Sequence, residues 1–309
     1  MSIDGLILVD KPEGMTSFGT DIYMRKVAQT KKVGHLGTLD PFATGLLPVA
    51  CGGALKYLRF CENYDKTYRC EALFGASTDT MDLTGEVIRE NYPSEEELER
   101  LEHEDFESVR KAFAEVARTT EQLPPKYSAK KIDGKRACDL VRAGENIELK
   151  PNRIQIFSLV INSITRAPRG FIVNFDTHCS KGTYIRTICD DCGRLTGYGA
   201  HAISLRRTGN GPFRVEGALT PERIAAMAES GDFSFVRPAS EMIAALPEIE
   251  LDAPQASFVR NGRRIVFPES FDGNGKPLYR ATYNGVLIAV VYPKAADGKV
   301  LMCVERGFC

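Results

Sequence analysis

The sequence predicts a protein of 309 residues that combines helices with β-strands, in one large region followed by a smaller β-rich one. Strand pairs joined by short turns are indicated at residues 154–177 and 279–292. Helix start signals stand at Ser94 and Thr220. The hydrophobic content of 43% allows a substantial core, and no stretch approaches the roughly 18 apolar residues of a membrane span.

The first elements are predicted from short apolar runs and turn residues. Residues 5–9 form an apolar run that predicts a strand entering a turn. Ser17 stands where its hydroxyl could cap a helix. A glycine-rich stretch over residues 33–53 follows, and residues 68–74 then have the pattern of another strand.

An acidic helix and a basic insertion are predicted in the middle of the chain. Ser94 and Glu97 have the spacing of a capping box, which predicts one amphipathic helix with apolar residues as far as Phe113. Its glutamates indicate a solvated face, because phosphates would repel them. From residue 118 to 153 basic residues outnumber acids, and Pro124-Pro125 interrupts regular structure. This segment is predicted to be a basic insertion with loops.

The remaining elements lead to a second domain. Residues 154–164 and 171–177 predict a hairpin, and residues 183–195 predict a helix ended by glycine. The hydroxyl and proline at Thr220-Pro221 predict a further helix. After residue 247 the chain has only short strand and turn patterns. We therefore predict two domains, residues 1–246 and residues 247–309.

Charge and cysteine content limit the possible functions. The formal net charge is −1, so any surface for nucleic acid must be local. Nine cysteines and an N-terminus without an export signal indicate reduced thiols in the cytoplasm. The one CxxC pair, Cys189 and Cys192, is weak evidence for zinc and is interpreted as two half-buried helix cysteines. The four histidines have no paired ligand spacing, so no metal is predicted.

Asp40 is the most informative carboxylate. Pro41 disfavours helical dihedrals at Asp40, and Gly34, Gly37 and Gly45 allow sharp turns or a close approach to a ligand. No second acid lies nearby, which excludes a paired-carboxylate glycosidase arrangement. A lone carboxylate of this kind suits a nucleophile, a general base or one metal ligand. By itself, however, an Asp-Pro pair is more typical of a simple turn than of a reactive carboxylate.

The segment around Asp40 resembles the catalytic loop of the tRNA pseudouridine synthase B family. It reads Gly-His-Leu-Gly-Thr-Leu-Asp-Pro-Phe-Ala-Thr-Gly-Leu-Leu-Pro over residues 34–48. Further matches follow in order over residues 3–215: Asp-Lys-Pro at 10–12, Gly-Met-Thr-Ser at 14–17, Lys-Thr-Tyr at 66–68, Thr-Asp-Thr-Met-Asp at 78–82, Pro-Pro-Lys-Tyr-Ser-Ala at 124–129, Cys-Ser-Lys-Gly-Thr-Tyr-Ile-Arg-Thr at 179–187 and Leu-Arg-Arg-Thr at 205–208.

The resemblance implies an α+β pseudouridine synthase fold with a mixed, largely antiparallel central sheet. It also implies an RNA-binding insertion and a small PUA-like C-terminal domain, although the C-terminal residues carry no motif that we can match. The implied reaction isomerises uridine-55 in the T arm of tRNA, on a flipped-out nucleotide, and uses no cofactor. Asp40 corresponds to the nucleophile, which can form a covalent intermediate through its carboxylate.

The resemblance also assigns partners to Asp40. Arg186 matches the arginine that pairs with the nucleophile and favours its ionised form by lowering its pKa. Tyr68 matches the tyrosine that stacks on the target base, and its phenol oxygen is a plausible group near C5. Tyr184 and Leu205 match positions that line the uracil pocket.

Other matched positions have supporting roles. His35 matches the histidine that contacts RNA around the flipped nucleotide, and Lys11 is expected to support the active-site loop. The insertion over residues 123–153 is expected to clamp RNA through phosphate and aromatic contacts. Its candidate residues are Lys126, Tyr127, Lys130, Lys131 and Arg136.

The expected partner is the T-arm stem–loop of tRNA, bound by a monomer with no guide RNA, no obligate protein partner and no membrane. The nearest alternative is the related guide-dependent enzyme of archaea and eukaryotes, and the basic insertion favours the stand-alone form. A second alternative is a non-catalytic RNA-binding module. A metal hydrolase receives no support from the histidines.

Overall fold

The computed structural model describes residues 3–128, 130–132, 135–145, 149–267, 278–296 and 298–308. The chain forms two compact units, Met1–Arg237 and Pro238–Cys309. This division lies before the domain boundary predicted near residue 247. In the described part of the chain, no helix combines the length and the apolar character needed to cross a membrane.

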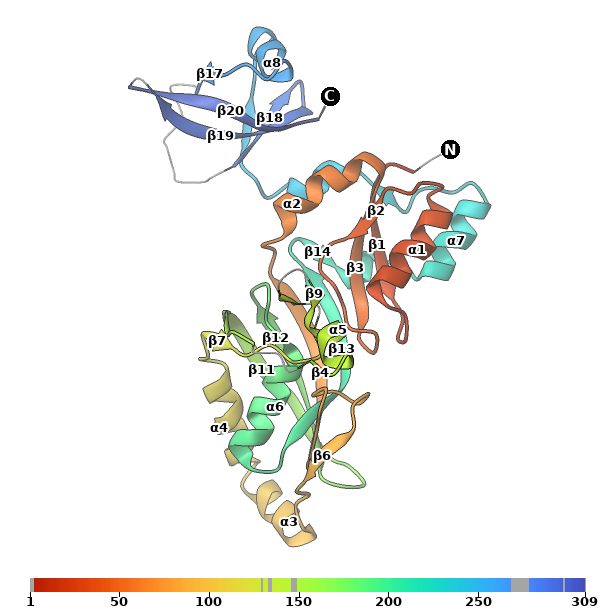
Figure 1. Cartoon of the computed structure of the whole chain (residues 1–309), viewed down its shortest axis with the longest axis vertical. Coiled ribbons are helices and arrows are strands. Elements are labelled where there is room, and N and C mark those ends of the chain that lie inside the picture. Colours follow the sequence, from red (N-terminus) through yellow and green to blue (C-terminus); the bar gives the residue numbers. More distant parts are fainter. Residues whose placement is uncertain are drawn as a thin grey trace. The chain divides into compact units, whose positions relative to one another are not determined.

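The first unit is built on a nine-stranded sheet with the order β11-β12-β4-β13-β3-β1-β15, to which β14 adds at β13 and β2 at β3 (Figure 1). Its strands are β1 (Gly5–Lys11), β2 (Val33–His35), β3 (Thr44–Cys51), β4 (Lys66–Phe74), β11 (Ile156–Arg166), β12 (Phe171–Cys179), β13 (Ala200–Asn210), β14 (Phe213–Arg214) and β15 (Val236–Arg237). Every pairing is antiparallel except that of β13 with β3. The predicted mixed, largely antiparallel sheet of an α+β fold is confirmed, as is the hairpin β11–β12.

The parallel pairing of β13 with β3 brings the Asp40 segment into the middle of the sheet. Arg207 on β13 lies opposite Gly45 at the start of β3. Gly45 has a φ of +99°, and a Cβ there would lie 2.3 Å from the carbonyl oxygen of Arg207. Only glycine permits this approach. The end of the loop that precedes Gly45 is therefore held close beside β13.

The first unit also contains seven helices within the described residues. They are α1 (Ser17–Val27), α2 (Leu58–Cys61), α3 (Glu95–His103), α4 (Glu107–Val116), α5 (Ala137–Arg142), α6 (Ile185–Thr196) and α7 (Pro221–Glu229), with 3-10 turns η1 (Gly52–Tyr57) and η2 (Val215–Gly217). Helix α6 packs on β13 and β4, and α4 packs on α6. Beneath them Phe74 stacks on Phe171 with ring centroids 4.9 Å apart, and Phe113 meets Phe175 edge-on. The predicted starts of α3, at Ser94, and of α7, at Thr220, are confirmed by their capping hydrogen bonds.

Two helix predictions were wrong in detail. Thr16, not Ser17, caps α1, because the Thr16 hydroxyl accepts from the Gly19 amide at 2.8 Å. The acidic segment is two helices rather than one, since Asp105 and Phe106 adopt left-handed conformations with φ of 48° and 52°. That break lets the Phe106 ring pack on Phe171 at 5.2 Å, so core packing prevails over a continuous amphipathic pattern.

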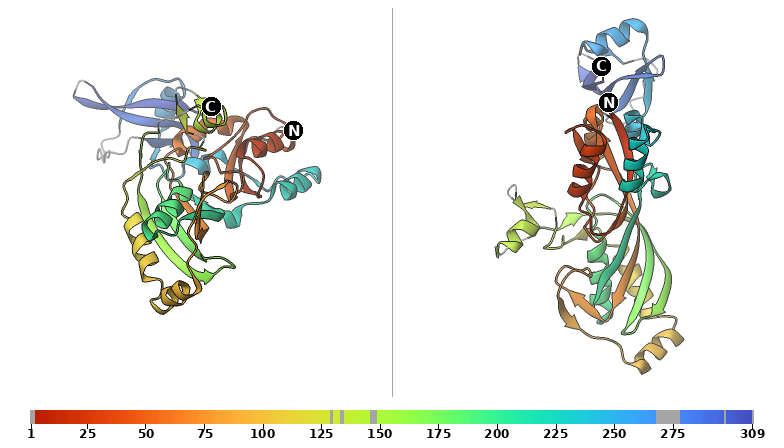
Figure 2. Two further views of the ribbon diagram at one scale, coloured as in Figure 1. Left: turned by 60° about the horizontal axis from the view of Figure 1, so that its bottom comes forward. Right: turned by 90° about the vertical axis from the view of Figure 1, so that its right-hand side faces the viewer.

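Small elements complete the first unit. A two-stranded ribbon pairs β5 (Ala76–Thr78) with β6 (Val87–Glu90). The basic insertion contains β7 (Glu121–Gln122), β8 (Lys131–Ile132), β9 (Lys135–Arg136) and β10 (Asn152–Arg153) together with α5. Figure 2 shows that α5 and its neighbours project from the body of this unit.

The second unit is β-rich and PUA-like, as expected. It contains η3 (Ala239–Ile243), β16 (Glu248–Glu250), α8 (Ala253–Arg260), β17 (Ile265–Val266), β18 (Tyr279–Tyr283), β19 (Val286–Ala296) and β20 (Lys299–Gly307), and its sheet has the order β16-β18-β19-β20-β17. The predicted hairpin β18–β19 turns at Asn284 and Gly285, both at positive φ. Helix α8 was not predicted, although Asp252 and Gln255 form a capping box before it.

Candidate active site

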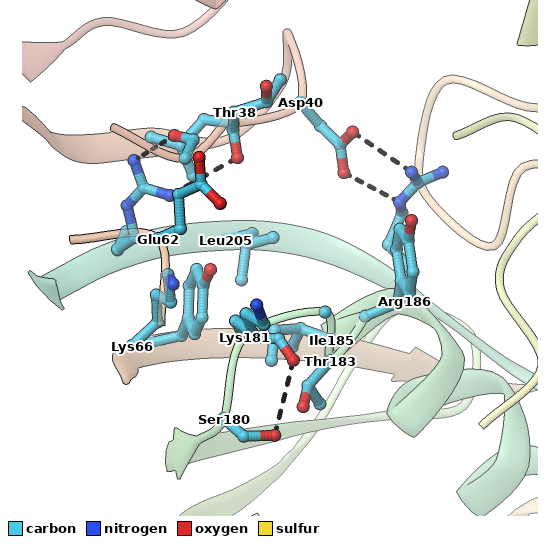
Figure 3. Close-up of a pocket in the computed structure, with 16 residues that line it drawn as sticks. Thr38, Asp40, Glu62, Lys66, Ser180, Lys181, Thr183, Ile185, Arg186 and Leu205 are labelled. Carbon is cyan, nitrogen blue, oxygen red and sulfur yellow. Dashed lines mark hydrogen bonds and ion pairs between the residues drawn. The ribbon is translucent and has the colours of Figure 1, made fainter. Parts of the chain in front are cut away.

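A pocket of about 280 Å³ opens where the Asp40 loop, β4 and the start of α6 meet (Figure 3). Its lining includes Asp40, Tyr68, Tyr184, Arg186 and Leu205. These residues come from four separate parts of the sequence, and the fold brings them around one cavity. They include every residue to which the sequence assigns a catalytic or uracil-lining role.

Side chains from β1 and α1 hold the Asp40 loop by its backbone. The Ser17 hydroxyl donates to the Leu39 carbonyl at 3.0 Å and accepts from the Leu39 amide at 2.8 Å. The fully buried Lys11 ammonium donates to the carbonyls of Pro12, Met15 and Pro41 at 2.7–3.2 Å. Burial lowers the pKa of Lys11 to about 8. Both residues next to Asp40 are thus anchored, which fixes the direction of its side chain.

Arg207 holds the same loop from the side of β13. It is almost completely buried, and its guanidinium donates to the carbonyls of Gly37 at 2.9 Å and Leu46 at 2.7 Å, with a longer contact to Thr38 at 3.4 Å. These carbonyls lie on both sides of Asp40 in the sequence. Arg207 on β13 also lies opposite Tyr68 on β4 in the register of the sheet. Arg207 therefore sets the position of the loop relative to Tyr68.

The Asp40 carboxylate meets Arg186 in a two-point contact. Nε of Arg186 lies 2.9 Å from Oδ2, and Nη2 donates to Oδ1 at 3.1 Å. The Asp40 side chain is 34% exposed, whereas that of Arg186 is 4% exposed. The carboxylate can therefore be reached from the pocket, while the guanidinium behind it is shielded. Such an arrangement suits a carboxylate that must be aimed at a reactant.

Arg186 is itself fixed by other groups. Its Nη1 donates to the Thr80 carbonyl at 2.8 Å and its Nη2 to the Tyr127 carbonyl at 3.0 Å. The start of α6 is held by Gln122, whose side chain accepts from the Tyr184 amide at 2.7 Å and donates to the Tyr184 carbonyl at 3.0 Å. The basic insertion thus contributes to the site through the backbone of Tyr127 and the side chain of Gln122.

Asp82 is a second carboxylate beside Arg186, and no role was predicted for it. Its Oδ2 lies 3.2 Å from Nη1 of Arg186, and its side chain is 5% exposed. Its Oδ1 accepts from the Thr80 hydroxyl at 2.8 Å and from the Thr84 amide at 2.9 Å. The run of residues 78–82 in the family resemblance was the signal that could have indicated it. Arg186 is therefore shared between an accessible and a buried carboxylate.

Burial raises the pKa of the Asp40 carboxyl above its usual value. The Arg186 guanidinium opposes this rise, and the Asp82 carboxylate adds to it. The sequence predicted the lowering by Arg186 but not the larger effect of burial. A carboxyl group is ionised above its pKa. Because burial raises the pKa of Asp40, this carboxylate depends on the Arg186 charge to stay ionised near neutral pH.

Other predicted residues lie outside the pocket lining. His35 places Nδ1 2.9 Å from Asp21 and Nε2 3.3 Å from the Thr38 hydroxyl. In the insertion Lys126 is exposed and Tyr127 is half-buried, while Lys130 donates to the Lys150 carbonyl and the Asn152 side chain. The side chains of Lys131 and Arg136 lie outside the described residues.

The CxxC cysteines are more deeply placed than predicted. Cys189 and Cys192 are fully buried, not half-buried, on the inner face of α6, and Cys189 lies 3.7 Å from Cys70 between sulfur atoms. Across the described ranges no group of three His, Cys, Asp or Glu residues is arranged to hold a metal ion.

Comparisons with known proteins place these residues in a family. The TruB family pseudouridylate synthase N-terminal domain matches residues 25–185, and the tRNA pseudouridylate synthase B C-terminal domain matches residues 186–243. The tRNA pseudouridine synthase B of Geobacter sulfurreducens is 39% identical over 297 residues, which cover 93% of each chain. That of Solibacter usitatus is 38% identical over 97% of this chain and its own full length.

Solved structures show the same fold. A chain in an H/ACA RNP bound to a substrate RNA containing 2′-deoxyuridine superposes with a TM-score of 0.70 over 99% of this chain and 85% of that chain, at 20% identity. A chain in a Cbf5-Nop10-Gar1 complex gives 0.68 at 23% identity, over 99% of this chain and 85% of its own. At such identities the likeness concerns the fold alone. The family models and the close relatives establish more: this chain belongs to the TruB family of pseudouridylate synthases and is an isomerase.

Proposed function

We propose that this chain isomerises uridine-55 in the T arm of tRNA to pseudouridine, with Asp40 as the nucleophile toward a flipped-out uridine. One observation carries the proposal: a carboxylate that is 34% exposed faces a pocket while an almost buried arginine fixes it from behind. The relatives that match nearly the whole chain are named for tRNA, which supports tRNA as the substrate.

The reaction breaks the N1–C1′ bond, turns the uracil and joins it again through C5. A carboxylate bonded to the nucleotide would keep the fragments together during this exchange. The placement of Asp40 serves attack at C1′ or at C6. Tyr68 offers a face for stacking, worth about 1–3 kcal/mol for an extruded base. Tyr184 contributes a polar side chain to the lining of the pocket, and Leu205 contributes an apolar one.

The target uridine must leave its loop to reach Asp40. Outside the pocket His35 is held by Asp21 and Thr38, where it can contact the disrupted RNA loop. The projecting insertion supplies Lys126 and Lys130 for phosphates. We propose that the enzyme acts alone as a monomer in the cytoplasm, without a guide RNA.

An assay on isolated RNA tests the function. Purified protein is incubated with a T-arm stem–loop, and pseudouridine is measured at each uridine. Conversion at position 55 alone supports the proposal. Conversion only with added guide RNA and protein partners would favour the guide-dependent alternative. Binding without conversion would favour a non-catalytic RNA-binding module.

The clamp is expected to contribute to the salt dependence of tRNA binding. Replacing Lys130, Lys131 and Arg136 together by glutamine should weaken binding and lower the slope of log K against log salt. The decrease should be about 0.7–0.9 for each phosphate contact that is lost. Lys111→Gln, on the exposed face of α4, is the matched control and should leave the slope unchanged. A slope that the triple variant does not alter would remove these residues from the RNA interface.

A further inference from the structure

Two cations in the pocket wall have no carboxylate partner. Lys66 is 8% exposed and Arg207 is 1% exposed, and both line the pocket. Among the described residues neither forms an ion pair with an acid. The adjacent Asp65 carboxylate lies 3.5 Å from His178 instead. An unpaired charge is costly to bury, so two of them at the wall of a reaction pocket require an explanation.

The two cations lie together beside the Asp40 loop. A Cβ placed on Gly37 would be 3.5 Å from Nη1 of Arg207 and 3.7 Å from Cε of Lys66. Lys66 is two residues before Tyr68 on β4, so both side chains leave the same face of the strand. In Figure 3 Lys66 stands on one side of the pocket and Asp40 with Arg186 on the other. The two buried cations therefore line the end of the pocket that faces away from the nucleophile, where the exposed Glu62 side chain belongs to the same lining but, among the described residues, forms no ion pair with either.

Lys66 has hydrogen-bonding capacity to spare. Arg207 directs three of its five N–H groups at the backbone carbonyls of the Asp40 loop and β3. The Lys66 ammonium carries three N–H groups. Its one hydrogen bond within the described residues goes to the Tyr64 carbonyl. Burial lowers the pKa of Lys66 to about 8, with Arg207 acting in the same direction, so the amine still carries its proton at pH 7.

The proposed reaction generates negative charge on the uracil. If an Asp40 oxygen bonds to C1′, the C1′–N1 bond breaks and its electron pair leaves on the ring, spread over N1, O2 and O4. If Asp40 adds to C6 instead, the electron pair of the C5–C6 double bond moves toward O4. In the first route C5 then attacks C1′ and displaces the Asp40 carboxylate, so the ring is anionic until that bond forms. In the second route the N1–C1′ bond breaks while Asp40 holds the ring at C6, C5 bonds to C1′, and the ring stays anionic until the Asp40 carboxylate leaves C6. In both routes the C5 proton is lost last. A fixed cation near the ring stabilises this state more than the neutral substrate.

We propose that Lys66, backed by Arg207, stabilises the negative charge that develops on the uracil ring during the reaction. This proposal rests on the proposed function. No proton is transferred by Lys66; its N–H groups donate to the anionic ring as the charge appears. Lys66 is thus a catalytic residue that acts on the uracil, while Asp40 acts on the carbon that it attacks.

A change of leaving group tests this role. Single-turnover rates are measured on two T-arm RNAs, one with uridine and one with 5-fluorouridine at the target position. Lys66→Met is expected to slow the reaction of uridine about 10²–10³-fold, the usual loss when one such donor is removed. Fluorine itself stabilises the ring anion. The rate with 5-fluorouridine, measured as consumption of that RNA, should therefore fall by a factor at least about tenfold smaller than the rate with uridine. Lys66→Arg keeps the cation and should recover most of the rate.

Controls separate this role from folding and from RNA binding. Removing an unpaired buried charge should not destabilise the fold, so the melting temperature of Lys66→Met should be no lower than that of the parent. Lys66→Gln provides a second variant with a neutral side chain. Lys181→Met, at an exposed lysine of the same pocket, should weaken RNA binding without changing the ratio of the two rates. Equal losses on both RNAs, or no loss, in folded Lys66 variants would overturn the proposal. If the parent protein, without any substitution, makes no pseudouridine, the proposed function is overturned instead.

Discussion

Asparagine in place of Asp40 is expected to abolish pseudouridine formation, with a fall in single-turnover rate of at least about 10⁴-fold, as for other nucleophiles that act within a catalytic unit. The amide has the same shape and can still contact Arg186, but its oxygen is too weak a nucleophile to bond to C1′ or C6. Binding of tRNA should change by no more than a few-fold, because the loop is held by Ser17, Lys11 and Arg207 rather than by the carboxylate.

A second Asp–Arg pair of the chain provides the control. Asp176 and Arg69 form an exposed pair at 2.8 Å on β12 and β4, away from the pocket lining. Asp176→Asn should alter stability by less than about 1 kcal/mol and leave the rate near that of the parent. Residual activity of Asp40→Asn above about 1% of the parent rate, with deamidation back to aspartate excluded by mass spectrometry, would rule out a covalent role for this carboxylate.

Local sequence patterns were sufficient for most elements because their causes are local. The capping box at Ser94, the proline after Thr220 and the Asn284-Gly285 turn each act over a few residues, and the structure has all of them. The break between α3 and α4 could not be predicted in this way. It depends on Phe106 meeting Phe171, which is 65 positions away in the sequence, within the core.

The site shows the same division between local and distant causes. The glycines and proline around Asp40 marked an unusual loop, but only the family resemblance distinguished a nucleophile from a turn. Ser17 was predicted to cap a helix, yet its hydroxyl binds Leu39 across a gap of 22 residues. Asp82 and Lys66 stood within matched segments without any assigned role. Their significance depends on burial and on which charges lie nearby, and neither property can be obtained from spacing along a chain.

Removal of the guanidinium at position 186 is expected to harm both the fold and the reaction. In Arg186→Met the almost buried Asp82 carboxylate loses its charged partner, and breaking such a pair costs about 3–5 kcal/mol. The midpoint of urea unfolding should therefore decrease. The pKa of Asp40, already raised by burial, should rise further without the opposing arginine. Because only the ionised carboxylate is a nucleophile, the rate at pH 7 should fall about 10³-fold or more.

The two effects can be separated by a second substitution and by pH. Arg186→Met combined with Asp82→Asn removes the stranded buried charge and should regain most of the lost stability while the rate stays low. Since a group with a raised pKa ionises as pH increases, the ratio of the Arg186→Met rate to the parent rate should increase with pH, while deprotonation of Lys66 affects both proteins alike. Arg186→Lys keeps a charge without the two-point contact, so its rate should lie between those of the parent and Arg186→Met. If the double variant regained activity together with stability, the arginine would serve only to neutralise Asp82, and Asp40 would need no charged partner to react.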